Sequence, residues 1–180
     1  MVEKANETFS LRPYRAEDCP GLVRVFENSV HGVHPGRAAC RDAYTPAQLE
    51  AWAPRLDGEE AAERERVWAL SLAEHVTLVA EHGGEPVGFA DLDVKQGYLD
   101  RLYVLPAMRG RGIASALTET LEEKARAAGR SVLITHASLT ARPFFEQRGY
   151  RAVRRQRVER RGVTMENIVM EKALDGACAG

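Results

Sequence analysis

The chain is poor in cysteine, in aromatic residues and in long apolar segments. Its three cysteines, Cys19, Cys40 and Cys178, lie far apart and show no spacing of a disulfide framework or a zinc site. We therefore expect free thiols in a reducing, cytoplasmic environment. No apolar run approaches the ~20 residues that cross a bilayer, and the polar N-terminal segment does not resemble a signal peptide. These absences predict a protein without a membrane partner.

An excess of one charge is also missing. The chain has 25 basic and 26 acidic residues, and the resulting formal net charge of −1 argues against a nucleic-acid partner. With 44% hydrophobic and 28% charged residues, the composition is typical of globular proteins. The length of 180 residues suits one domain. We expect a single domain over 1–180, with a core from about residue 8 to residue 174 and flexible ends.

Hydrophobic periodicity predicts a strand, helices, three strands, a helix, a strand, a helix and two strands. A meander followed by a crossover helix implies an α/β fold with a mixed sheet. Thr45, Pro46 and Gln48 predict a helix start with a capping box. The apolar run at 131–136 predicts a strand buried on both faces. The expected strands lie at 8–14, 76–81, 86–94, 97–104, 131–136, 150–159 and 163–172, and the expected helices at 16–33, 45–52, 59–75, 111–129 and 140–149.

A basic, glycine-containing segment, Met-Arg-Gly-Arg-Gly-Ile-Ala at 108–114, joins an expected strand to the longest amphipathic helix. The first N–H groups of a helix lack intrahelical acceptors, and the helix dipole adds positive charge there. Glycine lets a ligand approach the backbone closely. The segment therefore predicts an anion site, with a diphosphate as the expected ligand. The phosphate-loop and dinucleotide-binding patterns do not fit, and a basic loop without a ligand is the alternative.

Two segments resemble the signatures of the GNAT (Gcn5-related) N-acetyltransferases, in one bacterial branch of that family. Residues 109–114 are similar to Q/R-x-x-G-x-G/A, and residues 141–150 are similar to A-x-x-x-[YF]-E-x-x-G-[FY]. The resemblance covers Leu11 to Leu174. It implies a single GNAT domain with a mixed, mostly antiparallel sheet of about six or seven strands, flanked by helices. A splayed strand pair in that sheet would form the coenzyme A cleft.

The resemblance also implies how the chain would hold acetyl-CoA as co-substrate. The loop amides would bind the pyrophosphate, and free backbone groups of the preceding strand would pair with the pantetheine arm. Those strand amides would also polarise the thioester carbonyl. Ser138 stands where many members carry Asn, although it also reads as a helix-start cap beside Thr140. The implied cofactor-binding residues are Leu102, Tyr103, Val104, Arg109, Gly110, Arg111, Gly112, Ile113, Ala114, Ser138 and Phe145.

Acetyl transfer needs a neutral amine, so a base must accept a proton from the protonated acceptor. Asp100 is the base candidate, because it lies in an apolar strand on the same alternation face as Leu102 and Val104. Burial would raise its pKa, and an ion pair with an arginine is the alternative. His136 is a second candidate for a base or donor, or else a polar strand end. Phe145 replaces the Tyr that many members use to protonate the thiolate.

The region before the meander frames the acceptor pocket in this family, which makes His31, Tyr44 and Trp52 acceptor-site candidates. Packing in the core is the alternative for each. His31 and His34 have no third ligand in register, so we expect no metal. The arginines at 151–161 predict a solvated edge hairpin, which is a candidate homodimer edge.

The sequence is compatible with three functions. The first is an acetyl-CoA-dependent N-acetyltransferase that acetylates a primary amine of a small molecule or peptide by direct attack on the thioester. The second is an acyl-CoA-binding module with little or no activity, which the missing Tyr at Phe145 favours. The third is a protein-interaction or nucleic-acid module, for which the net charge offers no support.

Overall fold

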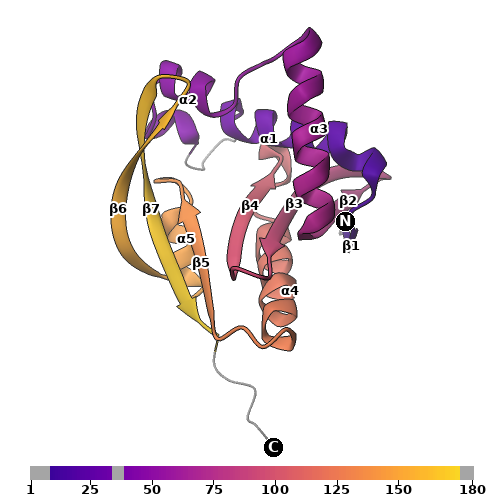
Figure 1. Cartoon of the computed structure of the whole chain (residues 1–180), viewed down its shortest axis with the longest axis vertical. Helices are drawn as coiled ribbons and strands as arrows, with labels where there is room; N and C mark the ends of the chain where they lie inside the picture. The colour runs from indigo at the N-terminus through magenta and orange to yellow at the C-terminus, as the bar shows by residue number, and fades with distance from the viewer. Residues whose placement is uncertain (1–8, 34–38, 175–180) are drawn as a thin grey trace, which may run out of the picture.

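The computed structural model describes residues 9–33 and 39–174. These residues form one seven-stranded sheet in the order β1-β2-β3-β4-β5-β7-β6 (Figure 1). Neighbouring strands are antiparallel, except that β4 and β5 are parallel. The predicted mixed, mostly antiparallel sheet and the order of elements are confirmed. The strands are β1 (Ser10–Pro13), β2 (Val76–His82), β3 (Glu85–Asp93), β4 (Tyr98–Val104), β5 (Val132–Ala137), β6 (Arg151–Arg160) and β7 (Val163–Ala173). The α-helices are α1 (Cys19–His31), α2 (Pro46–Trp52), α3 (Gly58–Glu74), α4 (Ile113–Ala127) and α5 (Arg142–Gln147).

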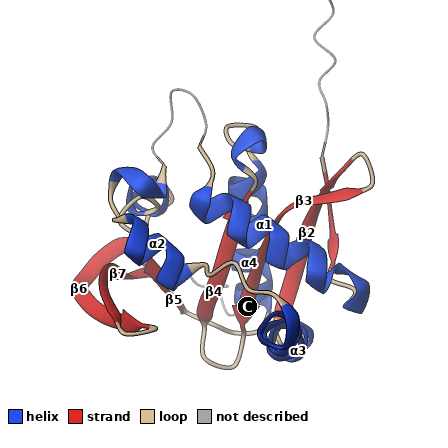
Figure 2. Ribbon diagram, turned by 90° about the horizontal axis from the view of Figure 1, so that it is seen from above, coloured by secondary structure: helices blue, strands red, loops and turns tan. Residues whose placement is uncertain are grey.

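Helices cover both faces of the sheet, which gives the core two parts (Figure 2). On one face, Ile113 and Leu121 of α4 are buried against the central strands, as the four-residue spacing of its apolar stripe predicts. On the other face, Leu22 of α1 and Leu72 of α3 pack with Phe89 of β3. Within the described ranges, none of the helices has the length and apolar character needed to span a membrane.

The predicted helix start at Thr45 is confirmed. The Thr45 hydroxyl accepts a hydrogen bond from the Gln48 backbone N–H at 3.3 Å. In return, the Gln48 side-chain oxygen accepts from the Thr45 backbone N–H at 2.9 Å, which completes the capping box. This short helix ends at Trp52 and so fixes where the Trp52 indole lies.

The prediction that β5 is buried on both faces is wrong. Leu133 and Ala137 are buried, whereas Val132 and Ile134 on the alternate positions are 41% and 37% exposed. His136 lies on the same exposed face. A short apolar run does not show by its composition whether one face or two are covered, because helices must be placed in space to decide this. The open face of β5 therefore continues into the cavities described below.

β4 and β5 separate soon after they meet. They pair only at Tyr98 with Ile134 and at Leu99 with Thr135. Beyond these pairs β4 stays with β3 and β5 stays with β7, and the two strands diverge toward α1 and α2 (Figure 1). Among the described strands, none pairs with the edge of Leu102–Val104 that faces β5. The predicted splayed strand pair is thus present.

A buried ion network lies beside this divergence. Arg101 of β4 donates from Nε and Nη2 to the two carboxylate oxygens of the fully buried Asp91, at 2.9 and 2.8 Å. His75, just after α3, places Nδ1 2.6 Å from Asp91 Oδ2, and this hydrogen bond raises the pKa of His75. The Arg101 guanidinium also lies over the Trp68 ring, 4.8 Å from its centre. The network joins α3 to β3 and β4.

We expect Asp91→Ala to lower the free energy of unfolding by about 3–5 kcal/mol, because it leaves the Arg101 guanidinium buried without a counter-charge. Denaturant unfolding followed by circular dichroism measures this change. Asp93→Ala is the matched control, since Asp93 lies two residues further along β3 and makes its hydrogen bonds within its own surface turn, to Gln96 and the Lys95 backbone. Similar losses in both variants would contradict the importance of the buried network.

Candidate active site

A cavity of 620 Å³ opens where β4 and β5 separate. Its walls come from α1, β4, the start of α4, β5 and α5. All the cofactor-binding residues predicted from the sequence line this one cavity, apart from Arg111. Their role in binding stays a prediction, but the fold brings them together. They are Leu102, Tyr103, Val104, Arg109, Gly110, Gly112, Ile113, Ala114, Ser138 and Phe145.

The loop that leads into α4 presents open backbone to this cavity. Gly110 and Gly112 have φ angles of 82° and 83°, a region that favours glycine. Gly112 is the N-cap of α4, and a Cβ built on it would meet no atom within 4 Å. The first N–H groups of a 15-residue helix thus lie beside open space without side chains in the way. This arrangement fits a diphosphate.

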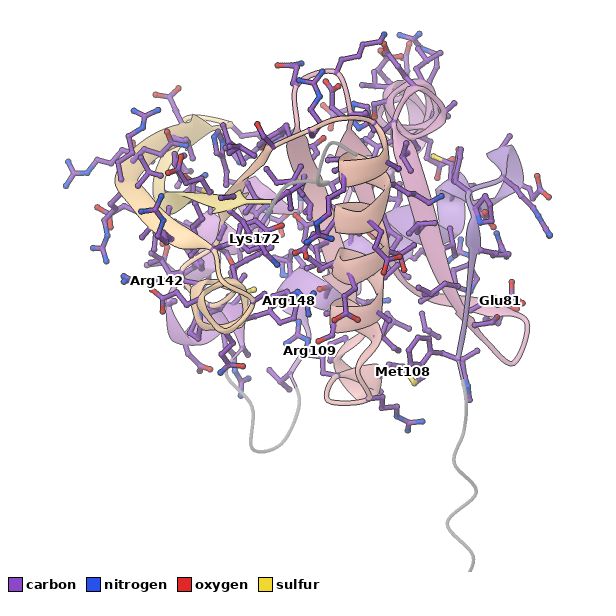
Figure 3. The ribbon with its side chains drawn as sticks, turned by 90° about the horizontal axis from the view of Figure 1, so that it is seen from below. Glu81, Met108, Arg109, Arg142, Arg148 and Lys172 are labelled. Carbon is purple, nitrogen blue, oxygen red and sulfur yellow. The ribbon has the colours of Figure 1, made fainter. Side chains whose placement is uncertain are left out.

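The Arg109 side chain ties the loop to α1. Its Nη2 donates a hydrogen bond to the Ser29 backbone oxygen in the last turn of α1, at 2.8 Å. A cation near the C-terminus of a helix is favourable for the helix dipole. Figure 3 shows Arg109 and Met108 at the end of α4 where the loop enters the helix. Arg109 therefore fixes the loop against α1, and an anion site on the backbone amides stays a prediction.

A second cavity, of 430 Å³, lies on the other side of the splayed strands. Its walls come from α1, α2, α3, β4 and the β6–β7 hairpin. Of the predicted acceptor residues, Tyr44 and Trp52 line it. The two cavities meet at five shared lining residues, which we call the junction. The junction residues are Trp52, Asp100, Tyr103, His136 and Ser138.

Asp100 reaches the junction because of a β-bulge. Asp91 pairs with Arg101 and Leu92 pairs with Leu99, so Asp100 is an extra residue on β4 with no partner on β3. The bulge interrupts the alternation that was expected along β4, as bulges near active sites commonly do. Asp100 therefore lines both cavities.

The electrostatic surroundings of Asp100 favour a proton acceptor with a raised affinity for protons. Burial and the negative charge of Asp91 raise the pKa of Asp100, against the attraction of Arg101. Arg101 Nη2 lies 3.5 Å from Asp100 Oδ2, so the ion pair that was the alternative reading is also present. The same guanidinium binds Asp91 at shorter distances, which leaves Asp100 the weaker partner.

His136 presents a neutral ring to the junction. Partial burial and the positive charge of Arg154 lower the pKa of His136. Its Nδ1 lies 3.4 Å from Gln156 Nε2, and its ring packs edge-on against Tyr98 at 5.2 Å. A neutral imidazole with one nitrogen held in this way can accept or relay a proton.

The position of Ser138 is compatible with both interpretations, a helix-start cap and a residue of the cofactor cleft. Its hydroxyl accepts a hydrogen bond from the Ala141 backbone N–H at 3.1 Å and lies 3.1 Å from the Thr140 hydroxyl. Ser138 thus caps the turn that leads into α5. It also lies at the junction.

The two aromatic positions of the cleft differ in their hydroxyls. Phe145 is 3% exposed and packs edge-on against Phe144 and Tyr150 at the cavity wall, without a donor group. The Tyr103 hydroxyl accepts a hydrogen bond from Trp52 Nε1 at 3.3 Å. Burial strongly raises the pKa of Tyr103, so this hydroxyl keeps its proton.

The remaining acceptor candidates have well-defined partners. The Tyr44 hydroxyl donates to the Glu166 backbone oxygen at 2.8 Å and accepts from the Leu139 N–H at 2.9 Å. Its polar group is therefore satisfied, and its ring remains as part of the wall. His31 lines neither cavity; its Nε2 lies 2.7 Å from the Ala53 backbone oxygen and joins α1 to the end of α2.

One cluster of ligand types occurs in the described part of the chain. Oxygen and nitrogen atoms of His75, Asp91 and Asp100 lie within 4.8 Å of one another. The Arg101 guanidinium already binds both oxygens of Asp91, and a metal ion there would face its positive charge. The cluster fits an ion-pair network better than a metal site. His34 lies outside the described residues, so the expectation of no metal stays a prediction.

Comparison with known proteins decides the family. The family profile described as "Acetyltransferase (GNAT) domain" matches residues 40–174. The chain belongs to the GNAT acetyltransferase family. It is 34% identical to the uncharacterized N-acetyltransferase YafP of Escherichia coli over 160 residues, which cover 89% of this chain and 93% of that protein. The GNAT assignment that the two sequence signatures implied is therefore confirmed.

Solved structures agree with this GNAT fold. A GCN5-related N-acetyltransferase from Rhodopseudomonas palustris superposes with a TM-score of 0.81 at 36% identity, covering 96% of this chain and 98% of that one. The PaiA N-acetyltransferase from Thermoplasma acidophilum, solved in complex with coenzyme A, gives a TM-score of 0.66 at 18% identity, covering 92% and 99%. At this lower identity the likeness concerns the fold.

Several residues of this GNAT site were missed by the sequence reasoning. Tyr98, Arg160 and Asn167 line the second cavity from β4, β6 and β7. The alternation along β6 was the available signal, but it could not show which face of the hairpin turns toward the cleft. Cys40 also lines the first cavity as a buried thiol, and burial raises its pKa.

Proposed function

We propose that this GNAT protein transfers the acetyl group of acetyl-CoA to a primary amine of a small molecule or peptide by direct attack on the thioester. The observation that carries the proposal is the junction, where a cleft suited to coenzyme A meets a second cavity beside a carboxylate and a neutral imidazole. A cytoplasmic location belongs to the proposal too, in keeping with the free thiols of Cys19 and Cys40.

The residues of the cleft have distinct tasks in this proposal. The amides of 109–114 bind the diphosphate, and the unpaired edge of Leu102–Val104 holds the pantetheine arm as an added strand. Backbone N–H groups of this edge also donate to the carbonyl oxygen as negative charge develops on it. The thioester supplies an electrophilic carbonyl and a thiolate leaving group.

Asp100 is the base of the proposed reaction. It accepts a proton from the acceptor ammonium, directly or through a water, with His136 beside it as a neutral relay. The amine nitrogen then bonds to the carbonyl carbon, the carbon–sulfur bond breaks and its electron pair leaves with the thiolate, and the second nitrogen proton passes to solvent water as the amide forms. A free thiol has a pKa of ~8.5, so its thiolate can leave without the hydroxyl that Phe145 lacks.

The alternative is an acyl-CoA-binding module with little or no activity, which the apolar Phe145 favours. Two assays separate the functions: calorimetric titration with coenzyme A, and release of free thiol from acetyl-CoA across a panel of amines. Binding together with amine-dependent thiol release supports the transferase. Binding without release across the panel supports the module, and absence of binding contradicts both.

A further inference from the structure

We propose that the acceptor is a small acidic amine: its amino group lies at the junction, an apolar or aromatic body fills the second cavity, and an anionic group, a carboxylate or phosphate, binds Arg160. This inference rests on the proposed function and adds the class of acceptor. It follows from the charges in the wall, from the aromatic lining and from the inner face of β6.

The charges of the second cavity are balanced except at one residue. Arg64 pairs with Glu27, and Arg101 pairs with Asp91 and Asp100. Glu166 pairs with two arginines of the outer face of β6, at 3.2 and 3.5 Å. Arg160 has no carboxylate partner anywhere in the described ranges, although it lines the cavity. A ligand that fills the cavity and carries a negative group would supply the missing counter-charge.

The position of Arg160 follows from the register of β6. Residues 154, 156, 158 and 160 lie on one face of the strand, which we call the inner face. Gln156 on this face contacts His136, and Val158 lines the second cavity. The outer-face residues Arg155 and Arg157 bind Glu166, so their charges are neutralised. The inner face keeps both of its positive charges, on Arg154 and Arg160, turned toward the open side of β5.

The positive charge of Arg160 acts on the junction residues, although Arg160 itself is not one of them. Burial raises the pKa values of Tyr98, Asp100 and Tyr103 and lowers that of His136; the positive charge of Arg160 opposes the rise in the first three and adds to the fall in His136. Arg160 lines the second cavity but not the first, whereas Asp100 and His136 line both cavities. An acceptor with its amine at Asp100 and its anionic group at Arg160 would therefore extend away from the thioester.

Aromatic rings line part of the space between these two ends, beside polar side chains such as Arg64, Ser71 and Asn167. Six aromatic residues line the second cavity, including both tryptophans of the chain. These rings favour a flat aromatic body. A volume of 430 Å³ suits a small molecule. The aromatic lining residues are Phe26, Tyr44, Trp52, Trp68, Tyr98 and Tyr103.

The two tryptophans provide a binding assay that needs no turnover. Para-aminomethylbenzoate, para-aminomethylbenzamide and benzylamine share one ring and one primary amine, but only para-aminomethylbenzoate has a carboxylate, at the opposite end of the ring from the amine. Each is titrated into the full chain saturated with coenzyme A, and tryptophan emission is followed. We expect para-aminomethylbenzoate to bind at least about tenfold more tightly than the other two, as one charge-assisted contact provides.

Two variants test the role of Arg160. Arg160→Gln should remove the preference for para-aminomethylbenzoate, whereas Arg157→Gln, on the outer face of the same strand, should keep it. Arg160 is exposed near the end of β6, so the fold should persist, and circular dichroism checks this. Equal binding of the three amines to the unmodified chain, no response to any of them, or a preference that survives in Arg160→Gln would overturn the inference.

Thiol release from acetyl-CoA separates this inference from the proposed function. Release with all three amines at equal kcat/KM, unchanged in Arg160→Gln, keeps the transferase and removes the acidic acceptor. A carboxylate preference in binding that depends on Arg160, without thiol release from any amine, keeps the acceptor class and removes the transfer.

Discussion

Asp100→Asn should lower kcat/KM for acetyl transfer about 100-fold or more, since general-base catalysis contributes ~10²–10⁴-fold. Burial and the charge of Asp91 raise the pKa of Asp100, so the rate of the unmodified enzyme should rise as pH passes upward through that pKa. The Asn side chain has the same shape but cannot accept the proton. In the variant this rise of the rate with pH should vanish. Only the rise set by deprotonation of the amine itself, whose pKa is ~10, should remain.

The pH–rate profiles of the variant, of His136→Gln and of Asp93→Asn distinguish the roles of these groups. His136→Gln should keep the rise of the rate with pH that Asp100 sets if the imidazole only relays the proton. Asp93→Asn is the control for loss of one carboxylate from the same region, because Asp93 makes its hydrogen bonds within a surface turn, to Gln96 and the Lys95 backbone. Coenzyme A affinity should not change in any of the three. An unaltered profile in Asp100→Asn would remove Asp100 from the mechanism.

Gly112→Glu should weaken coenzyme A binding by about 100-fold or more, because it replaces the interaction of a helix N-terminus with a diphosphate by repulsion between like charges. The fold should survive, since the new Cβ meets no atom within 4 Å. The left-handed backbone at φ 83° costs any non-glycine residue about 1 kcal/mol. Calorimetric titration with coenzyme A gives the affinity.

Gly112→Ala is the matched variant for this experiment. It carries the same backbone strain as Gly112→Glu but adds neither charge nor length. We expect it to lower thermal stability by a similar amount while keeping coenzyme A affinity within about tenfold of the unmodified chain. Equal affinities in the Glu variant and the unmodified chain would place the diphosphate elsewhere.

Much of the fold could be predicted from local sequence signals. The Thr45 capping box and the apolar stripe of α4 each depend on neighbours within a few residues. The two GNAT signatures located the cofactor loop, because that loop is made of consecutive residues. All but Arg111 of the residues predicted there line one cavity.

What could not be predicted depends on pairing between distant segments. The bulge that brings Asp100 to the junction exists only because Asp91 pairs with Arg101 and Leu92 with Leu99, and the sequence of β4 does not reveal this register. For the same reason the prediction that β5 is buried on both faces was wrong, and the sequence did not show which face of β6 turns toward the cleft. Arg160 thus reads in the sequence as one of several solvated arginines.

The short pairing between β4 and β5 has a consequence for protection against hydrogen–deuterium exchange. Only two residue pairs join the first four strands to the last three, so the protein without its co-substrate holds an interrupted ladder at the centre of its sheet. Amides at Leu102–Val104 that point into the gap should exchange quickly there and slowly once the pantetheine arm occupies the gap. Mass spectrometry of deuterated peptides would then report occupancy of the cleft for any acyl chain, whether or not an acceptor is known.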